Sequence, residues 1–165
     1  GSASYMQEII PRNKNKFKIK EGFFFQEFIE GEEYGMDILN STDGNYVHSF
    51  TKKKLMIKNG ETYSAVGVYD KKFEILAKKI SKLTKHIGVM DIDLILSKDN
   101  KIYVIDFNPR FGGGYPITHE HGFNYLEYLL RFYFEKKIIK FPVRKNKLLV
   151  SKGISIHSKV IWKHM

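Results

Sequence analysis

Two apolar segments joined by a short polar stretch constrain the fold of this chain more than any other feature. Residues 89–97 and 102–108 are rich in branched and aromatic side chains, which favour β-strands. Residues 98–101 between them read Lys-Asp-Asn-Lys, a composition typical of a tight turn. The two segments therefore predict an antiparallel hairpin.

The register of this hairpin decides which side chains share a face. If Ser97 pairs with Ile102, Asp93 lies opposite Asp106. Strand alternation then gathers a polar set on one face: Asp91, Asp93, Asp106 and Asn108. The other face receives an apolar set: Met90, Ile92, Leu94, Leu96, Tyr103, Ile105 and Phe107.

Opposed carboxylates repel one another and need a cation, a shared proton or a basic partner. Carboxylate and amide oxygens suit a hard ion such as Mg²⁺, which binds through one or two carboxylates together with substrate phosphates. A solvated sheet face with a chance cluster of aspartates is the alternative. It leaves the following sequence unexplained, Pro-Arg-Phe-Gly-Gly-Gly at residues 109–114.

The pattern D-I-D-(x)12-D-F-N-P-R-F-G-G-G resembles the metal-binding end of the ATP-grasp superfamily, most closely the large chain of carbamoyl-phosphate synthase and its relatives. The resemblance implies two Mg²⁺ ions, with Mn²⁺ as an option, held against the phosphates of ATP. By the same resemblance Asp93 is the first ligand, Asp106 the bridging carboxylate and Asn108 the amide ligand, and Arg110 steadies the transferred phosphoryl group. The family usually has Glu at the position of Asp106.

Residues 23–34, upstream of the hairpin, resemble the adenine hinge of the same family. The resemblance implies that Gln26 stands near the adenine amino group and that Glu27 and Ile29 offer main-chain contacts. Glu33, seven residues beyond Gln26, matches the carboxylate that accepts both ribose hydroxyls. An ordinary strand–turn–strand with an acidic tip is the alternative for this stretch.

Three further groups are candidates for the site. Of the three lysines at residues 52–54, on a strand that crosses the phosphates in the family, Lys54 is the expected ATP contact. The glycines at residues 112–114 permit close backbone approach and positive φ beside a phosphate or a carboxylate. His119 and His121 follow; a structural role is favoured for both over contact with substrate.

The remaining periodicity predicts an α+β fold, an antiparallel sheet with helices packed on one face, as in the C-terminal ATP-grasp subdomain. The expected strands, besides the hairpin, are 23–29, 33–40, 46–55, 62–69 and 148–156. A helix capped by Asp70 and stopped by Gly88 turns inward Phe73, Leu76, Ala77, Ile80, Leu83 and Ile87. A second helix, capped by Asn124 and reaching about Lys137, turns inward Tyr125, Leu126, Leu129, Leu130 and Tyr133.

The 165 residues are enough for one domain with its own core. We expect a tag remnant and lead-in at 1–22, the ATP-grasp subdomain at 23–140, and a closing strand and tail at 141–165. The chain has no cysteine and no apolar run of membrane-spanning length, which favours a cytoplasmic protein. Its net charge of +10 is spread over scattered lysines, so nucleic-acid binding is the least favoured reading.

The expected function is the ATP- and Mg²⁺-binding part of a ligase that joins a carboxylate to an amine, ammonia or a thiol through an acyl phosphate. A nucleotide-binding module or sensor without chemistry of its own is the alternative. The family's upstream lysine and glycine-rich loop are missing, so we expect the remaining half in cis or in trans and no activity from these residues alone. The small carboxylate, the acceptor and any homo-oligomer are left open.

Overall fold

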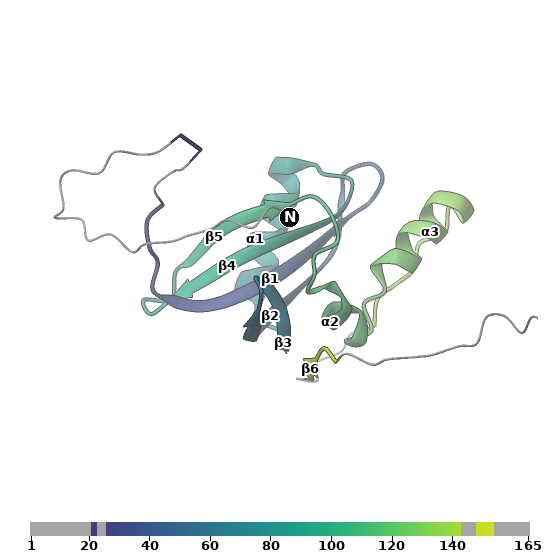
Figure 1. Cartoon of the computed structure of the whole chain (residues 1–165). Coiled ribbons are helices and arrows are strands. Elements are labelled where there is room, and N and C mark those ends of the chain that lie inside the picture. Colours follow the sequence, from purple (N-terminus) through teal and green to yellow (C-terminus); the bar gives the residue numbers. More distant parts are fainter. Residues whose placement is uncertain (1–20, 23–25, 143–147, 154–165) are drawn as a thin grey trace, which may run out of the picture.

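The computed structural model describes residues 21–22, 26–142 and 148–153. Within them, six strands form one antiparallel sheet in the order β5-β4-β1-β2-β3-β6, with three helices beside it (Figure 1). The elements are β1 Gly31–Asn40, β2 Tyr46–Lys58, β3 Glu61–Val68, α1 Lys71–Thr84, β4 Gly88–Ser97, β5 Ile102–Asn108, α2 Tyr115–Glu120, α3 Tyr125–Glu135 and β6 Leu149–Ser151. None of the helices in the described part of the chain has both the length and the apolarity needed to cross a membrane.

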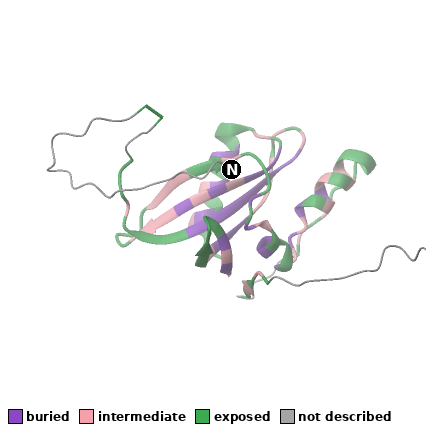
Figure 2. Ribbon diagram, viewed as in Figure 1, coloured by how far each residue is buried: buried purple, intermediate pink, exposed green. Residues whose placement is uncertain are grey.

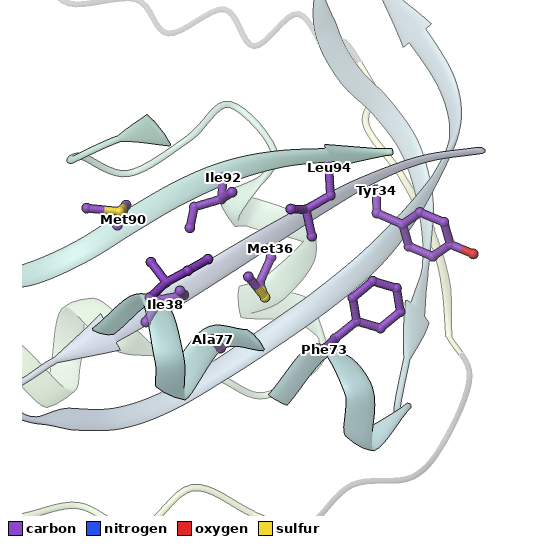
Figure 3. Packing of buried hydrophobic residues seen from close by; sticks show 9 residues of the cluster. Tyr34, Met36, Ile38, Phe73, Ala77, Met90, Ile92 and Leu94 are labelled. Atoms are coloured by element: carbon purple, nitrogen blue, oxygen red, sulfur yellow. The ribbon is translucent and has the colours of Figure 1, made fainter. Parts of the chain in front are cut away.

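The main core lies between α1 and the neighbouring strands β1 and β4. Every second residue of β1 and β4 points to this side, and α1 covers them with three buried side chains (Figure 3). The cluster consists of Tyr34, Met36, Ile38, Phe73, Ala77, Ile80, Met90, Ile92 and Leu94. Burying one such large side chain contributes about 1.5–3 kcal/mol, so this layer holds α1 to the sheet. The buried residues run along the middle strands in Figure 2.

A second, aromatic cluster lies against the opposite face of the sheet. It joins Leu39, Phe50 and Val89 of the strands to Phe123, Tyr125 and Tyr128 at the start of α3. The expected α+β class with an antiparallel sheet is confirmed. Helix α1 packs against one face of the sheet, as expected for the helices, whereas α2 and the beginning of α3 pack against the other face.

Both long helices start where the sequence predicts. The side chain of Asp70 accepts a hydrogen bond from the Lys72 amide, and that of Asn124 accepts one from the Glu127 amide. The predicted end of α1 at Gly88 is wrong: Lys85 takes a left-handed conformation with φ of 49° and its amide bonds to the Ser81 carbonyl, which ends the helix at Thr84.

Several expected inward positions on the helices are wrong as well. Leu83 and Ile87 are exposed, because one lies on the outer side of α1 and the other beyond its end. On α3 three of the expected inward residues are exposed: Leu126, Leu130 and Tyr133. The inward positions expected for Tyr125 and Leu129 are confirmed, and the other residues by which the helix meets the sheet are Tyr128 and Phe132, so the buried stripe is rotated by about one residue from the expected one.

The strand predicted at 23–29 is wrong over its described part, because residues 26–30 have no regular structure. Strand β1 begins at Gly31, which pairs with Ser97, the last residue of β4. The residues before Gly31 pass beyond the end of the neighbouring strand and therefore have no ladder partner there. The other predicted strands are present with bounds shifted by a few residues; residues 23–25 and 154–156 lie outside the described residues.

The predicted hairpin is present, and Asp93 pairs with Asp106 as expected. The turn-side register is wrong, since Ile102 pairs with Leu96 and not with Ser97. A β-bulge beside Asp93 inserts Ile105 into β5 and restores the polar pairing. Consequently Ile102 and Val104, not Tyr103 and Ile105, pack against the main core.

The aromatic cluster generates a prediction about pH. His48 stacks against Phe123 and Phe141, its Nδ1 lies 2.8 Å from the Tyr125 hydroxyl, and burial lowers its pKa to about 4. The unfolded chain, with a histidine pKa near 6.5, binds more protons between these values, so stability is complete above pH 6.5 and is lost as the pH falls towards 4. The free energy of unfolding should fall by about 2–3 kcal/mol through this group between pH 7 and pH 4.

Urea unfolding at pH 7.0 and 4.5 measures this loss. The His48→Gln variant, which removes the titrating ring, should lose clearly less stability over the same interval. Parallel losses in the two proteins would show that His48 does not carry the effect.

Candidate active site

The face of the sheet opposite α1 carries nearly all the polar side chains predicted to act together. Pairing residues lie on the same face, and Gly35 pairs with both Lys52 and Asp93, which in turn pairs with Asp106. One step along the strands, Asp37 pairs with Asp91, which pairs with Asn108. We call this surface the site face, defined by Glu33, Asp37, Lys52, Lys54, Asp91, Asp93, Asp106 and Asn108.

The three predicted metal ligands lie at the β4–β5 side of the site face. Asp93 and Asp106 are directly opposed, a geometry that brings Cβ atoms within roughly 5 Å. The Asn108 amide nitrogen donates to Asp106 Oδ2 at 3.1 Å, and its carbonyl oxygen, which accepts a hydrogen bond from Arg110, is the atom of this side chain able to coordinate a metal. Nowhere in residues 21–22, 26–142 and 148–153 do three His, Cys, Asp or Glu side chains converge on a metal position by themselves. Two carboxylates and one amide fit Mg²⁺ that takes its other ligands from phosphate and water.

Arg110 lies just beyond these ligands and is half exposed. Its guanidinium donates to Asn108 Oδ1 at 3.0 Å and to the Phe111 carbonyl at 3.1 Å, and it lies 3.9 Å from Asp91 Oδ2. Most of its five N–H groups remain accessible, so the planar fork is held at the edge of the metal-ligand group and is available to an anion.

Lys54 and Glu33 lie on the same face as the metal ligands. The Lys54 ammonium contacts Asp93 Oδ1 at 2.6 Å and lies 3.8 Å from Glu33 Oε2. The Lys54 side chain is only 9% exposed, whereas that of Glu33 is 53% exposed. Glu33 is two residues along β1 from the position that pairs with Asp93, roughly 7 Å away.

A buried polar group under α2 was missed in the sequence. Lys52 and Asp37 form an ion pair with both side chains almost fully buried, and Thr118 of α2 hydrogen-bonds to both of them. We call Lys52 and Asp37 the buried pair. The sequence does contain a signal for this pair. Asp37 interrupts an apolar strand on the same side as Glu33, and Lys52 lies on the same side of its strand as Lys54.

The glycine loop lies directly on these side chains. A Cβ atom on Gly112 would be 2.2 Å from the Asp91 carboxylate, and one on Gly114 would be 2.8 Å from the Lys52 Cε atom. Close backbone approach, one of the two expected reasons for these glycines, is therefore present. The expectation of positive φ is wrong, because none of residues 112–114 has a positive φ. Burial, followed by the charge of Asp37, raises the pKa of Asp91 to about 6.

The remaining predicted residues lie further out. Gln26 and Glu27 are exposed and Ile29 is half-buried, on the irregular stretch that leads into β1. His119 is exposed beside Tyr115, whereas His121 is buried and its Nδ1 lies 2.7 Å from the Ile117 carbonyl, the contact of a structural residue. Hollows of about 230 and 820 Å³ lie beside α1 and include none of the predicted site residues. The site face is thus covered by α2 around Asp37 and Lys52 and exposed at Asp106 and Arg110.

The sequence matches the model of a protein family described as the ATP-grasp domain over residues 1–114. This match covers more than half of the chain, and the chain therefore belongs to the ATP-grasp family. No curated protein matches the chain significantly in sequence.

Solved structures have a similar fold. An L-amino acid ligase from Bacillus licheniformis is 25% identical, with a TM-score of 0.47, and the match covers 64% of this chain and 30% of that one. Pyruvate carboxylase from Rhizobium etli is 22% identical with a TM-score of 0.53, over 63% and 11%. The biotin carboxylase domain of Hydrogenobacter thermophilus 2-oxoglutarate carboxylase, in complex with MgADP, ADP and bicarbonate, is 14% identical with a TM-score of 0.54, over 68% and 27%. The matches span less than a third of each of these structures.

The buried pair generates a prediction about stability. Lys52→Met removes one charge and leaves Asp37 uncompensated between the sheet and α2, which should cost about 3–5 kcal/mol. The double variant Lys52→Met/Asp37→Leu removes both charges and should recover most of that loss. Urea unfolding of the single and double variants measures the difference, and Lys53→Met, from the exposed pair with Glu32 on the other side of β2, is the matched control. A double variant as unstable as Lys52→Met would contradict the assignment.

Proposed function

We propose that this chain provides the ATP- and Mg²⁺-binding part of an ATP-dependent ligase. The observation that carries the proposal is the row of opposed Asp93 and Asp106 with Asn108 and Arg110 beside it, on the same face as Glu33. Oxygen ligands, an anion-binding fork and a ribose-type carboxylate are the three elements that a bound MgATP requires, and β1, β4 and β5 align them on one surface.

In this proposal each residue has a separate task. Asp93, Asp106 and the Asn108 oxygen hold Mg²⁺, which when bound neutralises charge on the transferred phosphoryl group. Arg110 binds the same phosphoryl group through N–H groups that Asn108 and Phe111 leave free. Glu33 accepts the ribose hydroxyls, and Gln26, Glu27 and Ile29 contact adenine. Positioning and electrostatic stabilisation supply the catalysis, and no side chain acts as a nucleophile.

The reaction class is activation of a carboxylate as an acyl phosphate, followed by attack of an amine, ammonia or a thiol. The Asp-Phe-Asn-Pro-Arg sequence at residues 106–110 supports a site like that of the large chain of carbamoyl-phosphate synthase. The biotin carboxylase domain solved in complex with MgADP, ADP and bicarbonate supports a nucleotide and a small carboxylate or carbonate as ligands of this fold.

The exposure of Asp106 and Arg110 supports the further proposal that a second structural unit covers the nucleotide. ATP lying on β1, β4 and β5 alone would remain in contact with water on its outer side, and phosphoryl transfer depends on closure that excludes water and aligns the acceptor. The covering half would be supplied in cis or in trans.

A nucleotide-binding module without chemistry is the second candidate. Asp106 favours it, because a side chain one methylene shorter than the usual Glu reaches less far between two metals. Carboxylate-dependent ADP formation by the chain together with its covering half separates the two candidates: a ligase releases ADP only with the correct carboxylate, and a sensor releases none.

The metal assignment predicts the effect of Asp106→Asn. Loss of one charge next to a divalent ion should weaken Mg²⁺-dependent ATP binding by at least about tenfold, whereas relief of repulsion against Asp93 should leave the fold intact. Calorimetric titration of MgATP and thermal unfolding measure the two effects. Asp99→Asn, in the exposed turn of the same hairpin, is the matched control. Equal affinities for MgATP in the Asp106→Asn variant and the parent chain would place the metal elsewhere.

The ribose assignment predicts a difference between two nucleotides. Glu33→Ala should cost on the order of 1.5–3 kcal/mol in ATP affinity, the magnitude of charge-assisted hydrogen bonds, and much less for 2′,3′-dideoxy-ATP. The neighbouring Glu32→Ala, on the other side of β1, should affect neither nucleotide. Equal losses for both nucleotides in the Glu33 variant would reject the assignment.

A further inference from the structure

Two lysines of β2 point to the site face and have different surroundings. Lys52 is held by Asp37 and Thr118 and is 1% exposed, so it belongs to the packed layer under α2. Lys54 is held by one strong contact, to Asp93, and its second carboxylate neighbour, Glu33, lies 3.8 Å away. Its ion pair therefore involves a residue that the metal requires.

The route of the Lys54 side chain explains how it reaches that residue. Lys54 is on β2 and Asp93 is on β4, with β1 between them. The ammonium crosses β1 where Gly35 lies, and a Cβ atom on Gly35 would be 3.7 Å from the Lys54 Cε atom and 3.2 Å from that of Lys52. The side chains of both lysines therefore pass over Gly35, where a Cβ atom would only touch Lys54 and would be tight against Lys52, so a larger side chain at this position would compete with Lys54 for its place against Asp93.

An ammonium in contact with Asp93 and a divalent cation on the same carboxylate repel each other. Two like charges a few ångströms apart at a half-buried site oppose binding by a factor of about ten or more. The opposed carboxylates of Asp93 and Asp106 need a positive charge nearby whether or not a metal ion is bound. In the structure, the Lys54 ammonium supplies that charge.

We propose that Lys54 is the resident counter-ion of the metal site, so that Lys54 and a divalent metal compete for Asp93. This inference rests on the proposed metal role of Asp93. Metal binding displaces the ammonium from Asp93, and Glu33 is the nearest other carboxylate along its path. Lys54 thereby becomes available to the anionic part of the nucleotide only when the metal has arrived.

The first test is a titration of the chain with Mn²⁺ alone, in which electron paramagnetic resonance measures the free ion. Lys54→Met should bind Mn²⁺ about tenfold more tightly than the parent chain, because the competing charge is gone. Lys53→Met, the adjacent lysine on the opposite face, is the matched control and should leave the affinity unchanged. Equal Mn²⁺ affinities in the parent chain and the Lys54 variant would overturn the counter-ion role and leave the metal site standing. Absence of Mn²⁺ binding in all three proteins would overturn the metal site itself, and this inference with it.

The second test uses the unaltered chain and does not depend on how a variant folds. Brief acetylation with and without Mg²⁺ alone, followed by peptide mass spectrometry, reports the accessibility of each lysine. Mg²⁺ should raise acetylation of Lys54 several-fold, leave Lys53 unchanged and leave Lys52 protected. Acetylation of Lys54 that does not respond to Mg²⁺, at concentrations that displace bound Mn²⁺, would overturn the proposal.

Discussion

The alternation of side chains along β1 and β4 is the constraint on which the rest of the structure depends. Both are interior strands of the sheet, so each side chain points either to the face covered by α1 or to the site face. Tyr34, Met36 and Ile38 on one side are interleaved with Glu33, Gly35 and Asp37 on the other. The core that fixes α1 therefore also fixes the site. A slip of the strand register by one residue would expose the apolar set and bury the polar set.

This arrangement places charged groups inside a folded domain, and their neutralisation determines how the second layer packs. The ion pair of Lys52 and Asp37 is covered by α2, and the Thr118 hydroxyl hydrogen-bonds to the Lys52 ammonium and to Asp37 Oδ2. Desolvating such a pair offsets most of its attraction, so its role is better described as specifying where α2 docks than as adding stability. Further out, Lys54 balances Asp93 at a place that water can reach. The two lysines thus differ in their partners: Lys52 contacts Asp37 and Thr118 of α2, and Lys54 contacts Asp93.

Much of the fold and of the site could be predicted from local patterns. Strand alternation was enough to oppose Asp93 and Asp106, and side-chain caps marked the starts of both long helices. The buried faces were harder, because a period of 3.6 residues fits two neighbouring stripes on α3 almost equally well and only tertiary contact chooses between Tyr128 and Leu126. Asp37 was missed because a single charge in an apolar strand has no meaning until its partner, fifteen residues away, is known to lie beside it.

The bulge in β5 has a consequence for how this hairpin tolerates change. Ile105 adds one residue on one strand, so the two ends of the hairpin are out of phase with each other. On the turn side of the bulge, Ile102 and Val104 pair with Leu96 and Leu94 in one register. On the other side, Asp93 pairs with Asp106 in a register shifted by one residue. A one-residue deletion between the turn and the bulge can thus be absorbed by loss of the bulge before it reaches the carboxylates, and deletion of Ile105 itself would leave Val104 opposite Leu94 and Asp106 opposite Asp93. The pairing of Asp93 with Asp106 is in this way separated from changes of length in the turn.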